Sequence, residues 1–225
     1  EAAAPGGAPP PAGNGLSALF QLMGNPAMEK QMGALASLRL DGQFGPLFKQ
    51  LNLGPDQVAQ FKQLLEEKEM VGFDSMSAAH QQGIDPKTDP RGFFQAVAEA
   101  EKSVDGQISG LLGGQGFDQF QQYLNTIPAR NTAQVLSQSL SYTGTPLTES
   151  QSAQVIDILT RDGTPALPPT NPFAVINGDL GVIKLSDQGV SQLQAMLAPA
   201  QFQALKQTMQ EHQQLLQARQ QMSAR

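Results

Sequence analysis

The chain has 225 residues, of which 40% are hydrophobic and only 15% are charged. This length suffices for one domain with a sizeable core or for two small domains. Its 14 basic and 20 acidic residues give a net charge of −6, which argues against nucleic-acid binding because phosphate backbones need clustered Lys and Arg. The chain has no cysteine, so disulfides, zinc–thiolate sites and thiol nucleophiles are excluded. No apolar run approaches the roughly 20 residues that span a bilayer.

The N-terminal stretch 1–15 is rich in Ala, Pro and Gly, and such a composition offers no apolar surface to bury. We expect it to form a disordered arm before a single helical domain over 16–225, with a subdivision conceivable at the proline-rich stretch 163–172. Glu1 in place of methionine predicts a signal peptide removed before it. The expected location is therefore the periplasm or another exported compartment.

Short helices are predicted in the first quarter of the chain. Leu16, Leu19, Phe20 and Met23 have helical spacing, and Gly24-Asn25-Pro26 ends this helix and starts the next. A stripe from Met28 to Leu38 follows, Asp41-Gly42 predicts a turn, and a further helix is expected over 44–51.

Longer amphipathic helices are predicted next, each bounded by Gly or Pro. The first begins at Pro55 and runs to about His80. The second covers 93–112 and ends at Gly113-Gly114. Further helices are expected from Phe117 to the Ile127-Pro128 break, from Val135 to Tyr142, from Glu149 to Gly163, after Ser186, and from Pro199 toward the C-terminus.

One segment has the composition of strands. Asn177-Gly178 lies between β-branched residues, which is a strong hairpin signal. The predicted fold class is therefore all-α, a multi-helix bundle or curved helical array with short loops and a small β-hairpin near residues 174–184.

Three helix starts share a five-residue pattern, a leucine followed four residues later by a glutamine. The pairs are Leu53 and Gln57, Leu147 and Gln151, and Leu197 and Gln201. With the second residue as N-cap, the glutamine falls at the third helical position, where its amide can reach back to the cap N–H. Thr148 is the best of the three caps, with Gly54 and Ala198 at the matching positions.

The middle pattern, Leu147-Thr148-Glu149-Ser150-Gln151, resembles the LTxxQ signature of the Spy/CpxP family. The resemblance implies an all-helical periplasmic stress protein, either an ATP-independent chaperone or a sensor-inhibiting adaptor. In such a protein a helical surface with apolar patches holds partly unfolded clients. The other two copies lack the threonine.

Catalytic and metal-binding patterns are absent from the sequence. The two histidines, His80 and His212, have no second ligand at metal spacing. The stretch 113–116 is glycine-rich, but it follows a helix and lacks the Lys-Ser/Thr pair of a phosphate-binding loop. The sequence therefore predicts no enzyme activity and no metal, nucleotide or other cofactor.

Function is expected to reside in an apolar helical surface that binds protein clients or a protein assembly. The candidate residues are Phe61, Leu65, Phe93, Phe94, Phe117, Phe120 and Phe202, most of which must also supply the core. The alternative is a structural or accessory subunit of an extracytoplasmic or membrane-associated assembly, held through its N-terminal arm. The glutamine-rich C-terminal helix could also form a homodimer seam.

Overall fold

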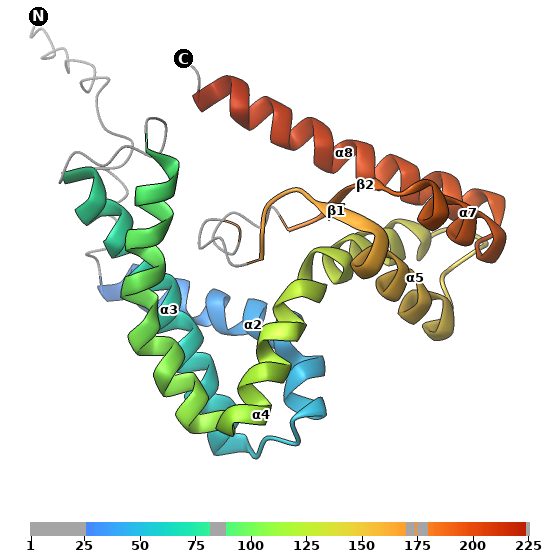
Figure 1. Ribbon diagram of the computed structural model, residues 1–225. Coiled ribbons are helices and arrows are strands. Elements are labelled where there is room, and N and C mark those ends of the chain that lie inside the picture. The colour runs from blue at the N-terminus through green and yellow to red at the C-terminus, as the bar shows by residue number, and fades with distance from the viewer. Residues whose placement is uncertain (1–25, 82–88, 170–173, 175–179, 224–225) are drawn as a thin grey trace, which may run out of the picture. The chain divides into compact units, whose positions relative to one another are not determined.

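The computed structural model describes residues 26–81, 89–169, 174 and 180–223. Within these residues the chain is almost entirely helical, with one two-stranded sheet, so the all-α prediction is confirmed (Figure 1). The elements are α2 (Pro26–Gln50), α3 (Pro55–Gln81), α4 (Pro90–Leu140), α5 (Glu149–Asp162), β1 (Gly163–Pro165), β2 (Val182–Leu185), α7 (Asp187–Met196) and α8 (Pro199–Ser223).

The chain divides into two compact units, Glu1–Gly45 and Pro46–Arg225, with the boundary inside α2. The turn predicted at Asp41-Gly42 is wrong, because α2 continues through it as one helix. A glycine inside a helix costs only about 1 kcal/mol relative to alanine. Buried side chains before and after the glycine continue the apolar stripe of this helix, and their burial outweighs that local cost. The predicted segment 16–23 lies outside the described residues.

The connection between α2 and α3 is a tight helix stop. Asn52 has a positive φ of 52°, the left-handed conformation that asparagine tolerates better than most residues. The Leu53 N–H donates to the Phe48 carbonyl at 3.1 Å, and the Asn52 N–H donates to the Lys49 carbonyl at 3.1 Å. This pair of bonds is a Schellman motif, which satisfies the last carbonyls of α2.

The longest helix, α4, is two helical limbs joined at Gly113, where the sequence predicts an end. Gly113 has φ 71° and ψ 168°, values that only glycine adopts without strain, and the ribbon changes direction at the bottom of α4 (Figure 1). The predicted break at Pro128 is wrong, because the second limb continues through it. Ile127 and Ala129 on either side are both 1% exposed. The free energy gained by burying them outweighs the loss of the hydrogen bond that proline cannot make.

Aromatic rings join α3 to both α4 and the end of α2. Phe61 meets Phe48 at a centroid distance of 5.8 Å and Phe120 at 5.3 Å, with interplanar angles of 70° and 83°. These edge-to-face contacts are the favoured geometry for aromatic pairs. We call the three residues the aromatic stack.

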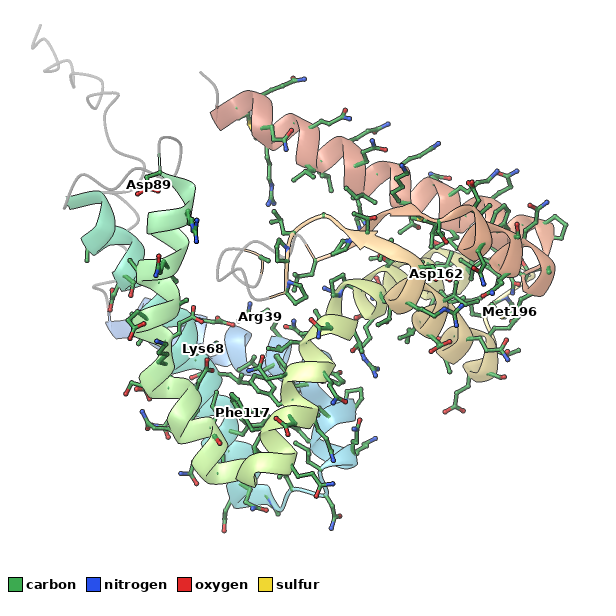
Figure 2. All side chains as sticks on the ribbon, in the orientation of Figure 1. Arg39, Lys68, Asp89, Phe117, Asp162 and Met196 are labelled. Atoms are coloured by element: carbon green, nitrogen blue, oxygen red, sulfur yellow. The ribbon has the colours of Figure 1, made fainter. Side chains whose placement is uncertain are left out.

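A lysine on α3 extends this packing toward the first limb of α4 (Figure 2). Lys68 Nζ lies 2.8 Å from Glu101 Oε2 and 2.7 Å from Asp105 Oδ1. The sequence places Lys68 and Glu101 on the apolar faces of their helices, and the pairing explains both positions. Glu101 is 8% exposed, so its charge needs this partner.

The second limb of α4 packs against α5, β2 and α8, and α7 closes the same cluster (Figure 1). The buried members are Ala129, Ala133, Leu136, Leu140, Val155, Ile158, Leu159, Val182, Leu193, Leu197, Phe202, Leu205 and Met209. We call this group the C-terminal core.

The sheet pairs segments that lie farther apart in the sequence than a tight hairpin would place them. β2 overlaps the end of the predicted range, but its antiparallel partner is Gly163–Pro165, at the end of α5. Asn177-Gly178, the predicted turn, lies outside the described residues. The partner strand follows α5 directly because Gly163 is the helix C-cap and has extended dihedral angles, φ −90° and ψ 146°.

The three helices that carry the glutamine pattern begin at Pro55, Glu149 and Pro199, where the sequence places them. In each, the glutamine side-chain oxygen accepts from the cap N–H. The distances are 3.1 Å for Gln57 to Gly54, 3.0 Å for Gln151 to Thr148 and 2.9 Å for Gln201 to Ala198. Thr148 also accepts from the Gln151 N–H at 3.1 Å, so α5 alone has a complete capping box.

Gln201 does more than cap its own helix. It is 4% exposed, and its Nε2 donates to the carbonyls of Thr145 at 3.3 Å and Pro146 at 3.0 Å. The Gln151 Nε2 also donates to Gln201 Oε1 at 3.3 Å. The two side-chain amides therefore join the starts of α5 and α8 to the loop before α5. We call this the amide junction.

Gln201→Ala is expected to lower the free energy of unfolding by about 2–3 kcal/mol, because it leaves several polar groups at the amide junction without partners. The matched control is Gln57→Ala, at the same place in an exposed copy of the pattern with its single cap bond. This change should cost no more than about 1 kcal/mol. Urea denaturation followed by circular dichroism compares the two, and equal costs would contradict the junction.

Candidate binding groove

A shallow groove lies where α8 meets β2 and α7. The apolar residues lining it are Ile183 and Leu185 from β2, Val190 from α7, and Phe202, Leu205 and Met209 from α8. Ile183 and Leu185 are two residues apart on an extended strand, so their side chains lie on the same face. The C-terminal core supports the groove from below, because Phe202, Leu205 and Met209 belong to it.

The rim of the groove is polar. Lys206, Gln210 and Gln213 line it from α8, and all three are exposed. The Lys206 ammonium lies 5.1 Å from the centre of the Phe202 ring, a distance at which a cation is attracted to an aromatic face. The rim thus offers amide groups and one positive charge around an apolar floor.

The volume of the groove is about 190 Å³. Pockets that enclose a drug-sized molecule usually measure about 300–1,000 Å³, so this groove is too small for that role. It has room for one or two apolar side chains from another chain. Its chemistry therefore suits a protein segment better than a metabolite.

The predicted surface residues do not form one exposed surface in the described part of the structure. Phe61 and Phe120 are fully buried in the aromatic stack, and Leu65 is 5% exposed. The prediction that these three form a binding surface is therefore wrong. They are the large apolar residues of the α3–α4 interface, and their helical spacing cannot distinguish a packed face from an exposed one.

The other predicted residues have different outcomes. Phe117 is partly exposed, and its ring centre lies 6.1 Å from that of Phe120. Phe202 is 9% exposed and forms part of the groove floor. The side chains of Phe93 and Phe94 lie outside the described set. Of the five predicted residues whose side chains are described, Phe202 thus lines the candidate site.

The residues that the sequence analysis missed are on β2 and α7. Ile183 and Leu185 alternate with the exposed Lys184, a period-two pattern typical of a strand with one packed face. That pattern identifies the strand face. It does not reveal that α8, which begins 14 residues after β2 ends, supplies the opposite wall.

Below the groove, β2 is in contact with both neighbouring helices. The Val182 N–H donates to Thr132 Oγ1 of α4 at 2.9 Å, and the imidazole of His212 on α8 lies against Gly181, just before the strand. Burial lowers the pKa of His212, while the Val182 backbone and the charge of Glu211 act in the opposite direction. A Cβ on Gly181 would overlap this ring, so glycine permits the close approach.

Metal-binding clusters are absent from the described part of the chain. No group of three or more His, Asp or Glu side chains there could hold a metal ion. His212 lies against backbone, and the side chain of His80 is outside the described set. The chemistry that the groove residues support is contact with apolar groups, with hydrogen bonding at the rim.

Comparisons of the chain with protein-family models, with curated proteins and with solved structures find no match. Among the described residues, none of the helices combines the length and the apolar character needed to span a membrane.

Proposed function

We propose that this protein is a non-catalytic, extracytoplasmic binding protein that holds apolar segments of other proteins in the groove between α8, β2 and α7. In this role it acts as an ATP-independent chaperone or stress adaptor. The observation that carries the proposal is the apolar floor of the groove inside a rim of glutamine and lysine. The LTxxQ pattern at 147–151 supports the extracytoplasmic setting by resemblance.

The size and the rim of the groove explain how such binding would work. One or two client side chains would cover the partly exposed Ile183 and Leu185, at about 25 cal/mol per Å² of apolar surface removed from water. The glutamine side chains can donate to and accept from a client backbone. Both contacts tolerate many client sequences, as a chaperone requires.

Ile183→Asp is the variant that tests the groove. Ile183 is partly exposed and is not among the residues packed on the C-terminal core. The free energy of unfolding of the variant should therefore stay within about 0.5 kcal/mol of the parent value. A carboxylate there should make binding weaker by about tenfold, the equivalent of 1.4 kcal/mol. The assay is light scattering by insulin reduced with dithiothreitol, which does not alter a chain without cysteine.

The matched control is Val135→Asp, an equal change at a 38% exposed position on α4 that does not line the groove. This variant should suppress insulin aggregation as well as the parent does. If the parent leaves aggregation unchanged, or if both variants lose activity equally, the groove is not a client site. Co-purification of one partner from the native host would then favour the accessory-subunit alternative.

A further inference from the structure

The contact between α8 and β2 contains a histidine with one unsatisfied nitrogen. His212 Nδ1 is buried and has no hydrogen-bond partner among the described residues. The Val182 backbone also lies close enough to the ring to raise its pKa. The Nδ1 edge lies against Gly181, where even a methyl group would overlap it.

This arrangement favours the neutral imidazole, in which Nδ1 can remain unprotonated and needs no acceptor. A second proton would create a charged N–H at Nδ1 with no acceptor among the described residues. Burying an unpaired charge is among the most costly changes in a folded protein.

We propose that His212 forms a pH-sensitive contact between α8 and β2, which we call the latch. This contact is intact when the imidazole is neutral and weakens when Nδ1 takes up a proton. The site of loosening adjoins the groove, since Met209 and Gln213 flank His212 on α8 and Ile183 follows Val182 on β2. Any effect on client binding rests on the proposed function, whereas the latch itself does not.

Few charged groups on the neighbouring elements can stabilise a positive charge on His212. Glu211, beside His212 on α8, is exposed and favours protonation. On β2, Lys184 is exposed, and on α7 the exposed Asp187 is the first residue of the helix. On α4, Arg130 lies over an aromatic ring at 4.5 Å, and residues 131–140 contain no ionisable side chain.

The direction of the pH dependence follows from the lowered pKa of His212. In the unfolded chain the imidazole titrates near its ordinary value of about 6.5. The folded protein therefore binds fewer protons than the unfolded chain just below that pH. Stability is fully present above about pH 6.5 and is lost as the pH falls toward the lower pKa of the folded state.

The test measures the urea midpoint of the full chain between pH 7.5 and 5.5, without any client, so its result is independent of the proposed function. The parent midpoint should fall across this range. His212→Gln, which keeps a polar side chain but does not titrate, should remove the fall. His80→Gln, at the only other histidine, should retain it. A fall that survives His212→Gln, or that disappears in His80→Gln, would overturn the latch.

A second measurement needs no variant, so it tests the latch even if His212→Gln fails to fold. The imidazole C–H signals of the parent protein report the titration of each histidine by NMR. His212 should titrate below 6.5, and the amide signals of 181–183 should shift with it. Titration of His212 at or above 6.5 would show that Nδ1 is not held in its neutral form.

Discussion

Phe61→Ala is expected to lower the free energy of unfolding by about 3–5 kcal/mol, the usual cost of removing a fully buried aromatic side chain. Phe61 is 0% exposed and is the central ring of the aromatic stack, in contact with Phe48 and Phe120. Its removal forfeits two edge-to-face contacts and leaves a cavity between α3 and α4. Urea denaturation followed by far-UV circular dichroism measures the loss.

Phe117→Ala is the matched control for the stack. It removes the same side chain from α4, but Phe117 is partly exposed and meets Phe120 only in a tilted arrangement at 6.1 Å. The expected cost is about 1–2 kcal/mol, because less apolar surface returns to water. Equal costs for the two variants would mean that Phe61 is not the centre of this packing.

Gly163→Ala is expected to destabilise the protein by about 3 kcal/mol, at the upper end of the usual cost of overpacking. The backbone of Gly163 is compatible with any residue, so the effect is steric. An added Cβ would overlap the Leu159 carbonyl oxygen and lie 2.8 Å from Val182 Cγ1. Both neighbours are fixed, one in the last turn of α5 and the other in β2. Thermal and urea denaturation measure the change.

Gly106→Ala has the opposite expected sign and serves as the control. Gly106 lies inside the first limb of α4, and no atom beyond the local helix lies within 4 Å of an added Cβ. Alanine there should raise stability by about 0.5–1 kcal/mol, because it limits the freedom of the unfolded chain. Destabilisation by Gly106→Ala would show that the surroundings of this glycine are not open.

The helix starts could be predicted because the forces that set them are local. Thr148 and Gln151 bond within one turn, so the sequence between them contains all the necessary information. The left-handed joint at Gly113 and the stop at Gly163 are equally local. The breaks expected at Asp41-Gly42 and Pro128 failed because burial of residues on both sides of each break outweighs a local preference.

The candidate groove could not be predicted in the same way. Its walls come from β2, α7 and α8. Helical spacing places Phe202 on an apolar helix face but does not show which element packs opposite that face. Phe61 and Phe202 both lie on helices that begin with the glutamine pattern, yet one is in the aromatic stack and the other is in the groove floor. Only the long-range pairing of the elements separates these two environments.

The amide junction has a consequence for how this sequence can change over evolutionary time. The Gln151 amide donates to Gln201 across 50 residues of chain. Loss of Gln201 removes this bond together with those to Thr145, Pro146 and the Ala198 cap, whereas Gln201 keeps these three bonds if Gln151 changes. Gln201 should therefore tolerate substitution less well than Gln151. Gln57 bonds only to its own cap and can drift alone. Two glutamines that look equivalent as helix caps are thus under different evolutionary constraint.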